Sequence, residues 1–130
     1  MIAIIDYQMG NLRSVQKGFE KIGQEAQIVS DPQQLKRATK VVLPGVGAFG
    51  DAMKELTQRG FVDPLREWLE QDRPFLGICV GLQLLYEGSW ECPDVRGLGV
   101  MDGRVELLPG DVKRPQMQWN RLEHRADHAM

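Results

Sequence analysis

Four short apolar runs separated by helical patterns constrain the fold of this chain more than any other feature. The runs are residues 2–5 (IAII), 26–29 (AQIV), 41–44 (VVLP) and 75–78 (FLGI). Each run has the length of a buried strand, and the segments between them carry apolar residues at helical spacing. Strands that alternate with helices form a parallel sheet with helices on both faces. We therefore expect an α/β fold in one domain over residues 1–130.

Signals at the ends of the intervening segments predict where the helices begin. Asn11 is a typical N-cap for a helix that Gly23 closes, and Asp31-Pro32 is typical of the start of a short helix. Further helices are predicted over residues 51–59, from Asp63-Pro64 onward, and over residues 80–87. Beyond them, the sequence predicts a loop over residues 89–99 and a hairpin around Asp102-Gly103.

Composition and charge exclude several classes of protein. The formal net charge of −2 argues against a general nucleic-acid binder. No apolar run approaches the roughly 18 residues that a membrane span requires, and the N-terminus lacks the basic region of a signal peptide. Two cysteines cannot form a disulfide framework. We therefore expect a cytoplasmic protein with reduced thiols and no membrane contact.

One cysteine lies at a special place in this pattern. Cys79 follows the fourth apolar run and stands between Gly77 and Gly81, with a helical segment after it. Glycine, any residue, cysteine, any residue, glycine between a strand and a helix is typical of a nucleophile elbow. A helix N-terminus favours the thiolate, and the N–H of Val80 can stabilise an oxyanion. The alternative is a buried core cysteine between two packing glycines.

A second glycine-rich segment follows the third apolar run. Gly45, Gly47 and Gly50 have the spacing of a dinucleotide-binding fingerprint. That fingerprint usually follows the first strand, and the next strand here does not end in the acidic residue that would bind a ribose. We favour a loop that faces the cysteine turn and directs N–H groups at a developing oxyanion. A plain glycine-rich turn is the alternative.

A metal site is not expected. Cys79, Cys92, His124 and His128 could be combined into a zinc set, but they lack the close pair of cysteines that is typical of such sites. Cys92 is interpreted as a loop thiol, and the stripe of Leu65, Trp68 and Leu69 as core.

With these features in place, the sequence resembles a known family. The segment GICVGLQLL is similar to the cysteine signature of the class I glutamine amidotransferases. The segments IAIIDYQMGNLRSV, LPGVGAFGDAM, GLGVMDGRV and PQMQWN resemble the amidotransferase subunits of imidazole glycerol phosphate synthase. The resemblance runs from Met1 to about Leu122. It implies a flavodoxin-like fold, with a parallel or mixed sheet and helices on both faces.

The resemblance also implies an activity. Such subunits hydrolyse glutamine to glutamate and ammonia without a cofactor. They pass the ammonia to a cyclase subunit, a (β/α)₈ barrel, within a heterodimer. The cyclase makes imidazole glycerol phosphate and the purine intermediate AICAR in histidine biosynthesis.

Residue roles follow from the same resemblance. Cys79 corresponds to the nucleophile and Gln83 to a glutamine-binding position. The oxyanion strand corresponds to Gly45, Val46 and Gly47, with Val80 as a second donor. Segments that face the cyclase contain Asn11, Met117, Trp119 and Asn120. Without the resemblance, Asn11 would be interpreted as a cap, Met117 and Trp119 as core, and Asn120 as a turn residue.

The sequence also departs from the family pattern. Gln8 stands where the family usually has glycine, and Gln116 and Gln118 depart from the usual PHMGWN. The family's catalytic histidine and glutamate form an H-x-E pair, but neither His124 nor His128 is followed by such a glutamate. We therefore expect the chain to correspond to the N-terminal two-thirds of an amidotransferase, with the C-terminal part missing and little turnover.

Two other functions stay open from the sequence. One is a catalytically incomplete fragment that serves as a docking module. The other is an amidotransferase subunit that serves a different synthase, against which the segment GNLRSV argues.

Overall fold

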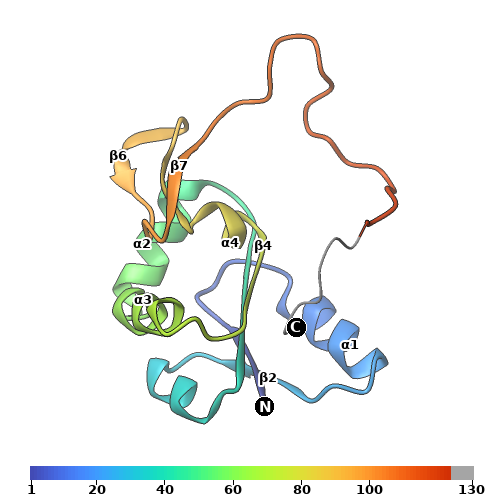
Figure 1. Ribbon diagram of the computed structural model, residues 1–130, viewed down its shortest axis with the longest axis vertical. Coiled ribbons are helices and arrows are strands. Elements are labelled where there is room, and N and C mark those ends of the chain that lie inside the picture. The colour runs from blue at the N-terminus through green and yellow to red at the C-terminus, as the bar shows by residue number, and fades with distance from the viewer. Residues whose placement is uncertain (124–130) are drawn as a thin grey trace.

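The computed structural model describes residues 1–123, which form two small sheets and four α-helices (Figure 1). The elements in chain order are β1 (Ile2–Ile5), α1 (Leu12–Lys21), β2 (Ala26–Val29), η1 (Pro32–Arg37), β3 (Lys40–Gly45), α2 (Phe49–Gln58), α3 (Val62–Glu70), β4 (Phe75–Cys79), α4 (Val80–Gln83), β5 (Tyr86–Ser89), β6 (Cys92–Arg96) and β7 (Met101–Val105).

The larger sheet contains the four strands that the apolar runs predict. Its strand order is β2-β1-β3-β4, and all three pairings are parallel. The predicted strands agree with the observed ones to within one residue at each end. Because the strands are parallel, their carboxyl ends lie along one edge of the sheet, which brings together the loops after β1 and β3 and the turn from β4 into α4.

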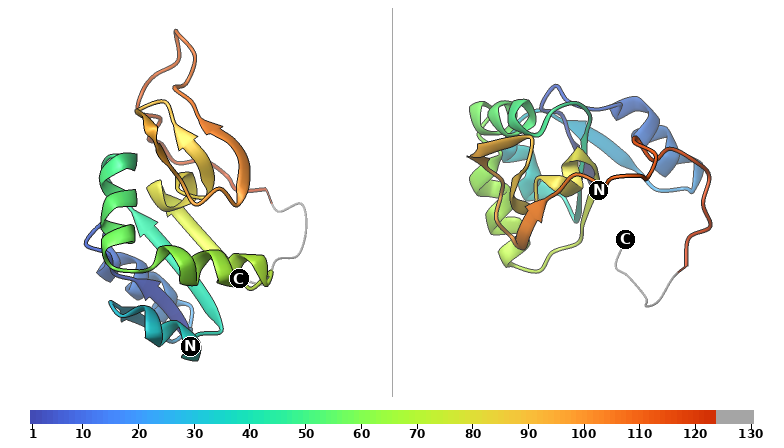
Figure 2. Two further views of the ribbon diagram at one scale, coloured as in Figure 1. Left: turned by 90° about the vertical axis from the view of Figure 1, so that its left-hand side faces the viewer. Right: turned by 90° about the horizontal axis from the view of Figure 1, so that it is seen from above.

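Helices cover both faces of this sheet, as expected for the fold class (Figure 2). One face packs against α2 and α3 and forms the main core, which includes Val41, Leu43, Phe49 and Leu65. The other face packs against the apolar side of α1. On that side Leu12, Val15 and Phe19 are only partly buried. The core interpretation of Leu65 and Trp68 is confirmed, since their exposed fractions are 0% and 3%.

The signals at Asn11, Gly23 and Asp31-Pro32 hold in the structure, but α3 begins at Val62, before Asp63-Pro64, and its N-cap Phe61 makes no side-chain hydrogen bond. The Asn11 side chain accepts a hydrogen bond from the N–H of Ser14, and Gly23 ends α1 with a φ of 75°. Asp31 and Gln34 form a capping box at the start of η1. The predicted short helix there is a 3-10 helix.

Three predictions for residues 80–109 are wrong. The helix expected over residues 80–87 ends at Gln83, because β5 begins at Tyr86. The carbonyls of Leu84 and Leu85 accept N–H groups from the segment around Leu98 to Met101, so tertiary pairing replaces the helix. The loop expected over residues 89–99 instead forms β6, which pairs antiparallel with β5. Asp102 and Gly103 lie within β7, which pairs parallel with β5 and makes no hairpin of its own.

Residues 106–123 contain no helix or strand and run outward as an extended loop (Figure 1). In residues 1–123, none of the helices has the length and apolar character that crossing a membrane would require.

Candidate active site

Cys79 has the backbone conformation of a residue at a sharp turn. It is the last residue of β4, and α4 begins at the next residue. Its φ of 55° and ψ of −118° lie in a backbone region that residues other than glycine rarely adopt. The thiol is exposed. The predicted elbow is therefore confirmed, and the alternative of a buried core cysteine is wrong.

Gly77 and Gly81 are required by the close approach of α4 to the sheet. A Cβ at Gly77 would lie 2.7 Å from the Cα of Leu82. A Cβ at Gly81 would collide with the carbonyl oxygen of Leu43 and lie 2.7 Å from its carbonyl carbon. These neighbours are backbone atoms, which cannot move independently of their elements. Glycine at both positions thus allows the helix to start directly against β3 and β4.

The last residue of β3, where the predicted glycine-rich segment starts, lies next to the cysteine. Gly45 is the register partner of Cys79 across the β3–β4 pair. Gly45 is buried against the elbow, since a Cβ there would lie 2.9 Å from the backbone N of Gly81. Val46 and Gly47 are exposed beyond it, and Gly47 has a φ of 93° that favours glycine. Of the residues that the resemblance assigns to the oxyanion strand, Gly45 therefore lies directly beside Cys79.

Gly50, the third glycine of the dinucleotide-like spacing, has a packing role. It lies within α2, and a Cβ there would lie 2.8 Å from the Sγ of Cys92. The thiol of Cys92 is half-buried against this helix. Its interpretation as a plain loop thiol is wrong, because Cys92 begins β6.

Tyr7 is a further residue of the site, which the sequence analysis missed. Its side chain is fully buried, and its hydroxyl donates a hydrogen bond of 2.8 Å to the carbonyl of Pro44. A Cβ at Gly45 would lie 2.6 Å from the same hydroxyl. Burial, and next the neighbouring charge of Cys79, raise the pKa of Tyr7 well above its ordinary value of 10.0. Tyr7 therefore holds the end of β3 as a neutral donor.

The remaining predicted site residues have different settings. Gln83 is half-buried at the end of α4, four residues after Cys79. Asn11 follows the loop after β1 and caps α1. Met117, Trp119 and Asn120 lie in the extended segment, where the exposed fractions of Met117 and Trp119 are 81% and 102%. The alternative that Met117 and Trp119 are core residues is wrong.

His124 and His128 lie outside the described residues, so the combination of these histidines with Cys79 and Cys92, which the sequence does not favour, lies partly outside the described structure. Within residues 1–123, no three His, Cys, Asp or Glu side chains come together in a way that could hold a metal.

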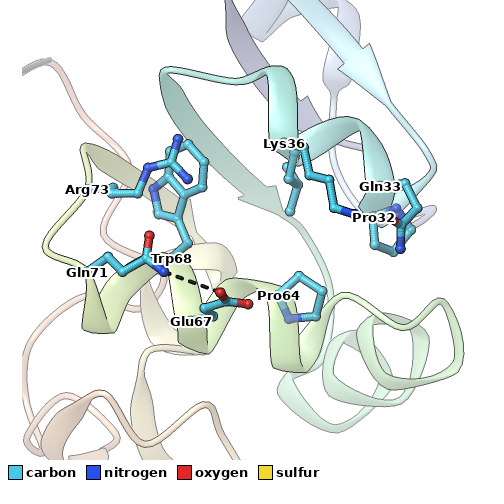
Figure 3. A pocket seen from close by; sticks show the side chains of 9 residues that line it. Pro32, Gln33, Lys36, Pro64, Glu67, Trp68, Gln71 and Arg73 are labelled. Carbon is cyan, nitrogen blue, oxygen red and sulfur yellow. Dashed lines mark hydrogen bonds between the residues drawn. The ribbon is translucent and has the colours of Figure 1, made fainter.

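A hollow that does not include Cys79 lies between η1 and α3 (Figure 3). At this hollow the guanidinium of Arg73 stacks 3.3 Å from the centroid of the Trp68 ring. Arg73 also donates to the carbonyl of Ala38, and the indole N–H of Trp68 donates to that of Pro74. These bonds fix the chain just before β4 starts. The hollow thus lies at the opposite end of that strand from Cys79.

Comparison with known proteins identifies the family. The sequence profile of the SNO glutamine amidotransferase family matches residues 6–108, which include the elbow, the loop after β3 and Tyr7. The chain belongs to this glutamine amidotransferase family.

Curated relatives narrow the likeness within the glutamine amidotransferases. The chain is 53% identical to the imidazole glycerol phosphate synthase subunit HisH of Syntrophotalea carbinolica, over 95% of this chain and 63% of the relative. It is 55% identical to the subunit of the same name from Geobacter metallireducens, over 93% of this chain and 61% of the relative. These findings confirm the resemblance drawn from the sequence motifs. The chain spans somewhat less than two-thirds of the length of these relatives.

Solved structures support the fold. A crystal structure of a glutamine amidotransferase superposes with a TM-score of 0.70 at 23% identity, over 82% of this chain and 56% of that one. A peptidase E-like protein from Listeria monocytogenes superposes with a TM-score of 0.57 at 13% identity, over 66% of this chain and 49% of that one. These likenesses extend the α/β architecture of the glutamine amidotransferase family to this chain.

Proposed function

We propose that this chain is the glutamine-hydrolysing part of an imidazole glycerol phosphate synthase. The observation that carries the proposal is the strained, exposed Cys79 next to Gly45 at the carboxyl edge of the sheet. The likeness to the HisH subunits supports the choice of synthase. Glutamine is the substrate, and its ammonia passes to a cyclase subunit of (β/α)₈-barrel fold in a cytoplasmic heterodimer. That subunit makes imidazole glycerol phosphate and AICAR for histidine biosynthesis.

The chemistry follows from the thiol and the N–H groups around it. The thiolate of Cys79 attacks the side-chain amide carbon of glutamine, and the carbonyl oxygen becomes an oxyanion. The N–H groups of Val80 and of the loop containing Val46 and Gly47 stabilise that charge. Collapse of the intermediate breaks the C–N bond, and ammonia leaves after it receives a proton. Water then cleaves the thioester to release glutamate and restore the thiol.

The last two steps need a general acid and base. Residues 1–123 contain no histidine, so the described residues supply the nucleophile and the oxyanion donors but not a histidine base. Loss of a positioned base slows such a transfer by about 10²–10⁴-fold. We therefore expect little glutamate release from the 130-residue chain alone. An extension with the C-terminal segment of a HisH relative should raise release, and the cyclase should raise it further.

A labelling experiment tests the proposal at the nucleophile. A diazoketone analogue of glutamine should modify Cys79 and leave Cys92 unmodified, as read by peptide mass spectrometry. The matched variants Cys79→Ser and Cys92→Ser should abolish and retain labelling, respectively. Equal labelling of both thiols would contradict the proposal, since it would show no recognition of the glutamine side chain at Cys79.

A glutamate-release assay tests whether the general base lies outside the 130-residue chain. If the 130-residue chain alone matched the extended chain, the base would lie within this sequence, and His124 and His128 would be the first residues to replace. If neither chain released glutamate with the cyclase present, the alternative of a docking module would be favoured.

A further inference from the structure

A pocket lined by arginines lies between α3 and the smaller sheet, and the glutaminase chemistry makes no use of it. It encloses about 560 Å³. Its lining includes Arg66 of α3, Arg96 of β6 and Arg104 of β7. Three arginines from three separate elements thus line one cavity.

Two of these arginines are fixed by backbone carbonyls. The Nε of Arg66 donates a bond of 3.0 Å to the carbonyl of Leu98. One terminal nitrogen of Arg104 donates a bond of 3.1 Å to the carbonyl of Ser89. The Arg104 guanidinium also lies against Gly88, where a Cβ would be 2.7 Å from its other terminal nitrogen. Each of these groups is held in position while it keeps further N–H donors.

The carboxylates at the pocket do not neutralise these cations. Glu87 and Asp94 also line the cavity, which leaves one positive charge when they are set against the three arginines. Glu87 is engaged elsewhere, because its carboxylate accepts the N–H of Gly103 at 2.8 Å. Within residues 1–123, no carboxylate oxygen lies within 4.0 Å of the charged nitrogens of these three arginines.

We propose that this arginine pocket binds a small phosphate-bearing anion. Guanidinium groups match the oxygens of a phosphate with paired hydrogen bonds, and groups that are already held lose little freedom on binding. The cavity is large enough for a phosphate monoester as well as for the free ion. The site goes beyond glutamine hydrolysis, and it does not require Cys79.

Calorimetric titration of the 130-residue chain at low ionic strength tests the site. Inorganic phosphate should bind saturably. Its binding should change the NMR chemical shifts of the backbone amides of Gly88, Gly97 and Gly99. Arg66→Gln and Arg104→Gln should each weaken binding by roughly tenfold or more, since each removes charge-assisted bonds. Arg37→Gln, on exposed η1, makes the same charge change outside the pocket and should leave the affinity unaltered.

Further arms of the titration identify the ligand. Tighter binding of glycerol 3-phosphate than of inorganic phosphate would indicate a phosphate monoester, and the reverse order would indicate the free ion. Preference for the dicarboxylate glutarate over both would overturn the phosphate assignment. No saturable binding, or equal weakening by Arg37→Gln, would overturn the site. Cys79→Ser should bind phosphate normally, so this outcome is independent of the glutaminase proposal.

Discussion

Replacement of Gly81 by alanine tests the claim that the turn at Cys79 requires a residue without a Cβ near the start of α4. The added Cβ would collide with the carbonyl oxygen of Leu43 and lie 2.7 Å from its carbonyl carbon, where ordinary contact begins near 3.4 Å. The start of α4 and the end of β3 must therefore separate by about 0.7 Å at that carbon, and further at the oxygen. Both are backbone atoms of packed elements, so no side chain can turn away to relieve the contact.

The expected loss follows from this geometry. Overpacking of a close-packed interior costs about 1–3 kcal/mol, and domains of this size are stable by only about 5–15 kcal/mol. Gly81→Ala should lower the urea midpoint measurably, without changing the slope of the transition. It should also slow labelling of Cys79 by the glutamine analogue, because Gly45 and the backbone N of Gly81 are in close contact.

Gly18 provides the matched control for this substitution. It lies in α1, and a Cβ there would have no atom within 4 Å. Gly18→Ala should stabilise the chain by about 0.5–1 kcal/mol, since alanine restricts the unfolded chain and favours the helix. If Gly81→Ala were as stable as Gly18→Ala and were labelled at the normal rate, the argument that the elbow requires glycine would be refuted.

Substitutions at three further positions test other parts of the site. Tyr7→Phe leaves the carbonyl of Pro44 without its donor and should cost about 1–3 kcal/mol at neutral pH. Because folding raises the pKa of Tyr7, its contribution is present below about pH 10 and is lost as the pH rises further, so the Phe variant should lose this alkaline fall in denaturation curves. Asn11→Ala should lower stability by about 1 kcal/mol through loss of the cap, and Asn11→Asp should restore it. Gln8→Gly should raise stability by about 1 kcal/mol in the same assay, because Gln8 has a φ of 67°; a fall would show that its side chain outweighs the strain.

The sequence predicts the larger sheet well because its signals are local. Short apolar runs mark β1 to β4, and the glycines around Cys79 mark the elbow, since no other residue fits such a close approach. The family resemblance then predicts that Gly45 and Val46 lie at the same edge of the sheet as Cys79. These features depend on residues that are near one another in the chain or on a topology that parallel strands share.

The smaller sheet was not predicted because its signals are not local. Leu82 and Leu85 have helical spacing, but distant N–H groups bind the carbonyls of Leu84 and Leu85. Asp102-Gly103 is a typical turn pair, but its strand pairs in parallel with β5. Tyr7 was missed for the same reason, since only the fold brings its hydroxyl to the carbonyl of Pro44.

The distance along the chain between the parts of this site has a consequence for folding kinetics. Tyr7 and Pro44, which the hydroxyl bond joins, are 37 positions apart. Contacts at such separations form slowly, because loop closure comes before the gain from the contact. The elbow conformation of Cys79 should therefore arise with the last ordering of the sheet. During refolding, helical ellipticity should return before the glutamine analogue labels Cys79. A partly folded chain would therefore expose a cysteine of ordinary reactivity toward the glutamine analogue.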